Sequence, residues 1–376
     1  MTVVDVHTHV YPPSYMSLLR SRDTVPYVRT FPPDETSRLI ILPGEDSPSS
    51  LSTSMGRPIG PEYYDISKKL AFMDAHGIDI SVISLANPWL DFLEPEEAGP
   101  AACALNDEVE ALCAKAGTTT VNGSTTSRLF AFGTLPLRAP SPEIIVAEIA
   151  RLKTKLPHMR GVIMGTTGLG KGLDDPALDP IYAALQEHKL LVFLHPHYGL
   201  PAEAFGPRAP SYGHVLPLAL GFPLETTIAV TRMLLSGVWD RYKRLNVLLA
   251  HSGGTLPFLA GRIDSCIAHD GHFQAPIVRR RSVWEVLKEN IYLDAVIYSD
   301  VGLKAAVDAA GADRLLFGTD HPFFPPPNGD SDSEGVKKSW MSVTTNYKAI
   351  HDAFGDDEKA AQDVLGGNAV RILNLT

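Results

Sequence analysis

The stretch Arg314-Leu-Leu-Phe-Gly-Thr-Asp320-His-Pro-Phe-Phe contains the clearest indication of the fold. Its short apolar run ends abruptly in Gly, an acid and Pro, which predicts a buried strand with the Asp320 carboxylate at its C-terminal tip. Barrel enzymes carry their catalytic groups at the carboxyl ends of their strands. Asp320 is therefore our candidate for the centre of a functional site.

Seven further apolar runs are separated from this one, and from each other, by segments long enough for helices. This alternation predicts an α/β protein with a single (β/α)8 TIM-barrel domain over residues 1–376, rather than an open sheet. The predicted strands are Val3–Val6, Ile80–Leu85, Leu129–Leu135, Gly161–Met164, Leu190–Leu194, Val247–Ala250, Ile291–Leu293 and Leu315–Phe317. Helices are predicted at 101–114, 142–154, 180–188, 224–236 and 301–310, and most clearly from an Asp65 N-cap to a Gly77 stop.

Three inserts do not fit a bare barrel. Residues 21–62 contain two strand-like segments, 25–31 and 38–42, around a Pro-Pro-Asp-Glu turn, which predicts a small β-hairpin insertion. Because the loop after a barrel's first strand opens on the active-site face, we expect this insertion over the barrel mouth. The inserts 117–127 and 325–335 are polar, and we expect mobile surface loops there.

Composition excludes several classes of function. The 376 residues include 44% hydrophobic and 20% charged residues, ordinary values for a globular protein, and the formal net charge of -10 argues against a nucleic-acid surface. The central apolar run Leu190–Leu194 is far shorter than the roughly 20 residues of a membrane helix, so we expect no membrane span. Without a basic, apolar leader at the N-terminus, a cytoplasmic location is expected. The three cysteines are expected to be free thiols: Cys103, Cys113 and Cys266.

Histidines near the ends of three predicted strands indicate a metal site. In Asp5-Val-His7-Thr-His9, side chains two apart share one face of a strand, so both imidazoles can bind one metal ion. Together with His195 and Asp320 they make a set of three nitrogens and one oxygen, which suits zinc or another first-row divalent ion. His251 also follows an apolar run, and we expect it beside the metal as an acid/base or as an anchor for Asp320.

Each histidine taken alone also has a purely structural interpretation, because a histidine near an apolar strand is usually a core residue. His197 and His321 are expected to be such structural residues. The fourth predicted strand has no lysine for a metal-bridging carbamate, so a mononuclear site fits better. The glycine-rich stretch 165–172 lacks the spacing of a phosphate-binding loop.

Four motifs together resemble the decarboxylase branch of the amidohydrolase superfamily, which includes aminocarboxymuconate-semialdehyde and resorcylate decarboxylases. They are Asp-Val-His7-Thr-His, Leu-His195-Pro-His, Ala-His251-Ser-Gly-Gly and Gly-Thr-Asp320-His-Pro-Phe. A second resemblance, to the fungal isoorotate (5-carboxyuracil) decarboxylases, covers nearly the whole chain. It rests on Ser84-Leu-Ala-Asn87-Pro-Trp, Gly168-Leu-Gly-Lys-Gly-Leu-Asp-Asp, His195-Pro-His-Tyr-Gly-Leu-Pro, Gly213-His-Val-Leu-Pro-Leu-Ala-Leu-Gly-Phe222-Pro, Tyr292-Leu-Asp-Ala-Val-Ile-Tyr-Ser and Asp320-His-Pro-Phe-Phe-Pro-Pro.

The resemblance implies zinc, or another divalent metal, on His7, His9, His195 and Asp320, with His251 beside it and no organic cofactor. It implies that the substrate is held by Arg57, Asn87, Phe222 and Phe323. The implied reaction is non-oxidative decarboxylation of 5-carboxyuracil to uracil and carbon dioxide in pyrimidine salvage, with Asp320 as the proton donor.

Alternatives remain open at this point. One is decarboxylation of another ring or of a muconate carboxylate. Another is metal-dependent hydrolysis of a lactone or amide on the same barrel, and a third is a non-catalytic metal- or ligand-binding barrel. In related decarboxylases an arginine at the place of Arg262 reaches a neighbouring active site, which implies a homodimer or a dimer-built tetramer. A local ion pair on the helix surface is the other interpretation of Arg262.

Overall fold

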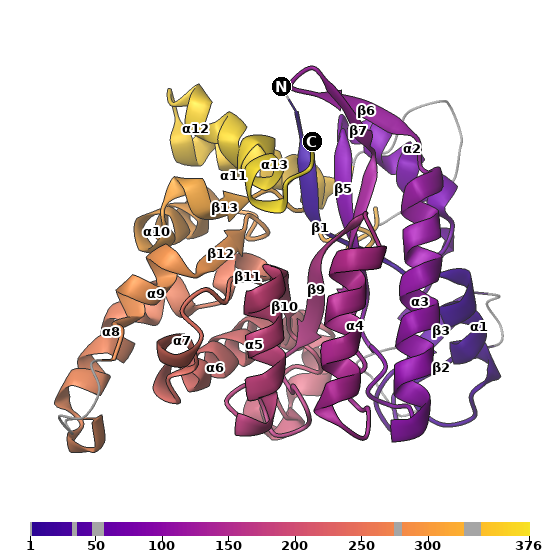
Figure 1. Ribbon diagram of the computed structural model, residues 1–376, viewed down its shortest axis with the longest axis horizontal. Helices are drawn as coiled ribbons and strands as arrows, with labels where there is room; N and C mark the ends of the chain where they lie inside the picture. The colour runs from indigo at the N-terminus through magenta and orange to yellow at the C-terminus, as the bar shows by residue number, and fades with distance from the viewer. Residues whose placement is uncertain (1, 32–35, 47–55, 274–279, 327–339) are drawn as a thin grey trace.

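The computed structural model of the protein describes residues 2–31, 36–46, 56–273, 280–326 and 340–376. Its centre is an eight-stranded parallel sheet in the order β1-β5-β8-β9-β10-β11-β12-β13 (Figure 1). The strands are β1 (Val4–Val10), β5 (Ile80–Leu85), β8 (Leu129–Thr134), β9 (Met159–Gly165), β10 (Leu191–His195), β11 (Val247–Leu249), β12 (Ile291–Asp294) and β13 (Leu315–Leu316). All eight predicted strands are confirmed.

The sheet closes on itself where β13 and the residues after it meet β1. Val6 N donates to Phe317 O at 3.0 Å, and His9 N donates to His321 O at 2.8 Å. A parallel bridge pairs Thr8 with His321. Sequential parallel strands, a helix after most of them and this closure confirm the predicted (β/α)8 barrel.

Strand residues alternate between the barrel interior and the helix layer. On β8 and β10, the rings of Phe132 and Phe193 lie 5.3 Å apart, and Phe193 is 5.0 Å from the ring of His7. The alternate residues Ala131 and Leu194 belong instead to the apolar cluster that contains core residues of the surrounding helices. The interior therefore offers a packed aromatic floor beneath the carboxyl ends of the strands.

Helices surround the barrel: α1 (Pro13–Ser21), α2 (Ile66–His76), α3 (Pro95–Lys115), α4 (Pro142–Lys155), α5 (Asp179–His188), α6 (Phe222–Leu235), α7 (Val238–Arg241), α8 (Leu256–His269), α9 (Val283–Glu289), α10 (Asp300–Ala310), α11 (Met341–Phe354), α12 (Glu358–Gln362) and α13 (Asn368–Leu373). The predicted caps of α2 are confirmed, because Asp65 accepts from Ser67 N at 2.9 Å and Gly77 is left-handed with φ 65°. The sequence did not predict α8, which buries only Leu256 and Ala260 and so lacks a clear apolar stripe.

The first insert forms a small antiparallel sheet. Strands β2 (Tyr27–Thr30) and β3 (Ser37–Ile40) pair with each other, and β4 (Arg57–Pro58) pairs with β3. The predicted turn at residues 32–35 lies outside the described residues, as do residues 327–335 of the third insert.

The prediction of a mobile loop at 117–127 is wrong. Strands β6 (Thr118–Val121) and β7 (Ser124–Ser127) form a two-stranded hairpin. Its turn residues Asn122 and Gly123 have φ of 50° and 81°, the left-handed conformation that an Asn-Gly turn adopts between β-branched strands. Thr126 is buried and its hydroxyl donates to Leu375 O at 2.7 Å, which ties the hairpin to the C-terminus.

One helical stretch of the described residues, Pro217–Leu235, is long and apolar enough to cross a membrane by length and composition alone. The sequence predicted no such span. Within this stretch, however, Glu225 accepts hydrogen bonds from His197 N at 2.9 Å, from Gly199 N at 2.6 Å and from the Thr166 hydroxyl. These contacts dock the stretch on the loops after β9 and β10, as expected of a barrel helix.

Candidate metal centre

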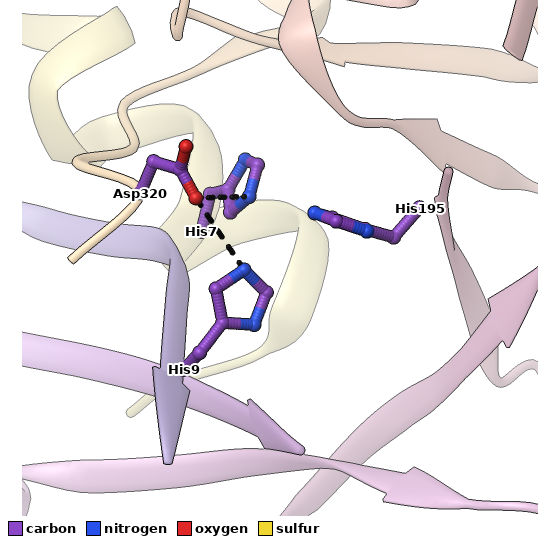
Figure 2. A group of neighbouring side chains, drawn as sticks. All are labelled: His7, His9, His195 and Asp320. Carbon is purple, nitrogen blue, oxygen red and sulfur yellow. Dashed lines mark ion pairs between the residues drawn. The ribbon is translucent and has the colours of Figure 1, made fainter. Parts of the chain in front are cut away.

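Four side chains predicted to bind a metal meet at the carboxyl ends of the strands. One donor atom from each of His7, His9, His195 and Asp320 lies within 4.8 Å of the other three, and all four residues are buried. Figure 2 shows His7 and His9 beside the Asp320 carboxylate, with His195 reaching toward them from the facing side. The structure thus brings together residues that are up to 313 positions apart.

Local backbone geometry explains how these side chains converge. His7 and His9 alternate with buried Thr8 on β1, so both imidazoles point to the interior. Asp320 has φ 59°, an uncommon left-handed conformation that turns the chain after β13, and its N–H donates to His7 O at 2.8 Å. As a result, Asp320 Oδ1 lies 3.3 Å from His7 Nε2 and 3.6 Å from His9 Nε2.

The hydrogen bonds of the imidazoles fit a metal ion. In each ligand histidine Nδ1 has an outer partner: Asp294 Oδ2 at 2.6 Å for His7, the Ser84 hydroxyl at 3.0 Å for His9, and Pro196 O at 2.7 Å for His195. The Nε2 atoms of His7 and His9 are buried and have no hydrogen-bond partner within the described part of the chain. Metal-binding histidines show this arrangement, with one nitrogen fixed from behind and the other free for the ion.

The electrostatics of the cluster agree with that fit. Burial lowers the pKa of His9 to about 4 and the pKa of His195 well below its usual range, so both rings are neutral, as metal binding requires. Burial also opposes charge on His7, but the carboxylates of Asp320 and Asp294 raise the pKa of His7 to about 10. Burial alone raises the pKa of Asp320, yet the charge of His7 and hydrogen bonding with His251 hold it well below its usual range. Without a metal ion, a proton on His7 offsets the two carboxylates, and a bound cation would replace that proton.

Asp294 is a site residue that the sequence reasoning missed. It ends β12 and is fully buried. Besides His7 Nδ1, it accepts the backbone N–H groups of His251 at 3.0 Å, Ser252 at 2.8 Å and Val296 at 3.0 Å. The signal that could have found it is the one that identified Asp320, an acid at the end of an apolar run.

Lys69 is a second residue that was missed, because the sequence placed it on a helix without assigning it a role. It is 1% exposed, and its Nζ lies 2.5 Å from the Thr8 hydroxyl and 2.5 Å from His321 Nδ1. Burial lowers the pKa of Lys69 to about 7. His321 stacks on Phe72 with ring centroids 3.7 Å apart and lies outside the ligand cluster.

His251 stands at the edge of the cluster. Its Nε2 lies 3.9 Å from Asp320 Oδ2, and its side chain is 15% exposed. His197, in the loop after β10, does not join the cluster and contacts the loops after β5 and β9. Its carbonyl accepts from Asn87 Nδ2 at 2.6 Å, and its Nδ1 is 3.0 Å from the Thr167 hydroxyl.

The predicted substrate-binding residues lie around the mouth. Arg57 donates to Asn87 Oδ1 at 3.4 Å, and its guanidinium carbon is 5.0 Å from the centre of the Phe323 ring. Phe323 in turn is 5.6 Å from the ring of His9. Phe222 begins α6 and packs against Gly199 in the loop after β10. A Cβ atom added to Gly199 would lie 3.4 Å from the Phe222 ring. Arg262 is exposed on α8.

The chain is similar to several amidohydrolases and decarboxylases. A family model described as amidohydrolase matches residues 4–375. The crystal structure of apo IDCase from Metarhizium anisopliae is 54% identical, with a TM-score of 0.91 over 100% of this chain and 97% of that chain. The 2-amino-3-carboxymuconate-6-semialdehyde decarboxylase of Dictyostelium discoideum is 25% identical over 99% of this chain and 91% of its own length. A dihydroxybenzoic acid decarboxylase from Polaromonas, solved with bound manganese, is 22% identical with a TM-score of 0.70 over 100% and 97% of the two chains, which shows a shared fold.

Proposed function

Because the chain belongs to the amidohydrolase family, we propose that it is a metal-dependent decarboxylase that converts 5-carboxyuracil (isoorotate) to uracil and carbon dioxide. The observation that carries this proposal is the buried His7, His9, His195 and Asp320 cluster in a chain 54% identical over its whole length to IDCase. The full-length decarboxylase relative from Dictyostelium supports the reaction class.

Zinc is the metal that we propose for this centre. Three imidazole nitrogens and one carboxylate oxygen form a donor set that zinc accepts well, and manganese is the alternative with a precedent in a protein of the same fold. When bound, the metal would supply Lewis-acid polarisation and a template for a chelating carboxylate and ring carbonyl. No organic cofactor is required for the reaction.

Asp320 is the proposed proton donor. It would take up a proton by way of His251 and deliver it to the ring carbon that bears the carboxylate, making that carbon tetrahedral. The bond to the carboxylate then breaks, its electron pair stays with the ring, and carbon dioxide leaves as the ring regains its conjugation. His251, which lies 3.9 Å from Asp320 and is partly open to solvent, would supply this proton and replace it after each turnover.

The residues at the mouth would bind and orient the ring. Arg57 offers a planar fork for ring or carboxylate oxygens, and Asn87 holds that fork in place through its own side-chain oxygen. Phe323, which lies under the Arg57 guanidinium, and Phe222 supply apolar faces for the ring. Their enclosure of the substrate would exclude water from the carbon that is protonated.

The substrate assignment is tested by product analysis. Zinc-loaded protein is incubated anaerobically at neutral pH with 5-carboxyuracil and without nicotinamide, flavin or pyridoxal phosphate. We expect uracil and carbon dioxide in equal amounts. Orotate is the matched control and should react poorly, because its carboxylate is on the adjacent ring carbon and cannot chelate together with the same carbonyl. Decarboxylation of 2,6-dihydroxybenzoate but not of 5-carboxyuracil would retain the reaction class and refute the substrate.

We also propose that the protein is a homodimer or a dimer-built tetramer. Several large apolar side chains are exposed on α8, α10 and the segment around α6: Phe258 at 85%, Val301 at 73%, Val215 at 66% and Ile228 at 50%. A second copy that covered them would remove this surface from water. Sedimentation analysis at assay concentration tests the proposal, and a fully active monomer would refute it.

A further inference from the structure

The loop between β12 and α10 holds an aromatic residue in an unusual conformation. Tyr298 has φ 59°, a left-handed geometry that a bulky residue rarely adopts. Its N–H donates to Asn346 Oδ1 at 3.1 Å, and the amide of Asn346 donates to Gly318 O at 3.1 Å. Buried Asn346 thus fixes Tyr298 to the backbone two residues before the predicted ligand Asp320.

The hydroxyl of Tyr298 is buried without a hydrogen-bond partner among the described residues. The nearby carboxylate of Asp294 cannot accept a hydrogen bond from this hydroxyl, because His7 Nδ1 and three backbone N–H groups already occupy both carboxylate oxygens. The ring of Tyr298 meets that of Phe324 edge to face at 6.1 Å, which holds the phenol in the loop. A buried hydroxyl held in this way and left unsatisfied is unfavourable unless something else accepts it.

The charge environment defines what that partner can be. Burial raises the pKa of Tyr298, and the carboxylates of Asp320 and Asp294 raise it further, so the phenol is neutral and acts as a donor near the cluster. A ligand oxygen that accepts a hydrogen bond would satisfy this buried O–H group.

We propose that Tyr298 is a substrate-contacting residue whose hydroxyl donates to a carbonyl or carboxylate oxygen of the bound ring. The identity of that ring rests on the proposed function. Residues in unfavourable backbone conformations are often found where they orient a ligand. A site that donates a hydrogen bond to a substrate oxygen also discriminates against rings that lack this oxygen.

The test is Tyr298→Phe, which removes only the hydroxyl. We expect kcat/KM for 5-carboxyuracil to fall by roughly 10- to 100-fold, because a hydrogen bond to a charged or polarised oxygen is lost. Zinc content should not change, and the thermal midpoint should stay level or rise, since the substitution removes an unsatisfied buried group. Tyr292→Phe is the matched control: Tyr292 lies at the start of β12, 4.3 Å from the Arg314 guanidinium, and its variant should keep wild-type kcat/KM.

A Tyr298→Phe enzyme with kcat/KM within twofold of wild type would overturn the proposal. A lower thermal midpoint in that same enzyme would assign the hydroxyl a structural role. If wild-type protein fails to decarboxylate 5-carboxyuracil, that result refutes the proposed substrate alone. The hydroxyl is then tested by calorimetric titration of both zinc-loaded proteins with 2,6-dihydroxybenzoate. A weaker affinity of the variant supports the contact, and equal affinities refute it.

Discussion

The two sides of the barrel that supply the metal ligands are held together by different means. On one side, the β8–β10 wall (residues 129–134, 159–165 and 191–195) consists of paired, buried and mostly apolar strands, and five consecutive residue pairs join β9 to β10. On the other, the β13–β1 seam (residues 315–321 against 4–10) has few backbone bonds, because β13 is only two residues long.

Polar side chains make up for the short pairing at the seam. Asp5 accepts from the Thr319 hydroxyl at 2.7 Å and from Thr319 N at 3.1 Å. Next to this pair, Lys69 joins Thr8 to His321, and the Thr8 hydroxyl donates to His321 O at 3.1 Å. The seam carries the predicted ligands His7, His9 and Asp320, whereas the wall carries His195 (Figure 2). We infer that polar contacts across the seam position three of the four predicted ligands, whereas the backbone ladder of the wall positions His195.

The largest effect is expected from the ligands themselves. His7→Ala should abolish activity and bind least zinc, because it removes a donor and leaves the buried carboxylates of Asp294 and Asp320 without their partner. His195→Ala should also be inactive, but should retain more zinc because only a neutral ring is lost. Elemental analysis after dialysis against graded chelator measures this difference. Full zinc content in either inactive variant would refute its role as a ligand.

A smaller effect is expected behind the seam at Asp294. Asp294→Asn weakens the acceptor that fixes His7, and loss of such an outer partner typically lowers metal affinity by roughly 10- to 100-fold. Competition with a chelating dye measures the zinc dissociation constant. The control Asp308→Asn changes an exposed acid on α10 and should leave it unchanged. Wild-type zinc affinity in the Asp294 variant would show that His7 needs no support from behind.

Lys69→Met should lower both the stability of the protein and its zinc affinity, because Lys69 joins the two sides of the seam. The variant leaves His321 Nδ1 buried without a partner, which costs about 1–3 kcal/mol of stability. It should also weaken zinc binding severalfold, because Thr8 lies between two ligands and His321 follows a third. Lys68→Met, at an exposed position on the same helix, is the matched control. If the variant had a lower melting temperature but unchanged zinc affinity, the polar contacts of the seam would stabilise the fold without positioning the ligands. The proposed difference between seam and wall would then be wrong.

The sequence predicted the wall better than the seam, for a physical reason. Strand pairing and burial leave a local pattern of apolar runs, so all eight strands and six of the helices in the described residues could be predicted from the sequence. The candidate ligands were found because they follow those runs. Lys69 leaves no such pattern. The apolar residues of α2 do not by themselves identify its buried face, because Lys69 is buried beside Phe72 and Met73 while Ile66 and Leu70 are only partly buried. Only the closed barrel brings Lys69 to Thr8 and His321, through contacts between residues 61 and 252 positions apart.

The smallest effect is expected on the wall, where Ile163→Val removes one methyl group from a residue that is 2% exposed on β9. Such a change typically costs about 0.5–1.5 kcal/mol, because a small cavity replaces lost contacts. The melting temperature should therefore fall by a few degrees at most. Zinc affinity should remain at the wild-type value, because the backbone ladder of β9 and β10 fixes His195 without that methyl group. Calorimetric melting and the dye competition, applied to the same protein, measure both quantities. A loss of zinc affinity as large as that of Lys69→Met would show that wall packing sets the ligand geometry after all.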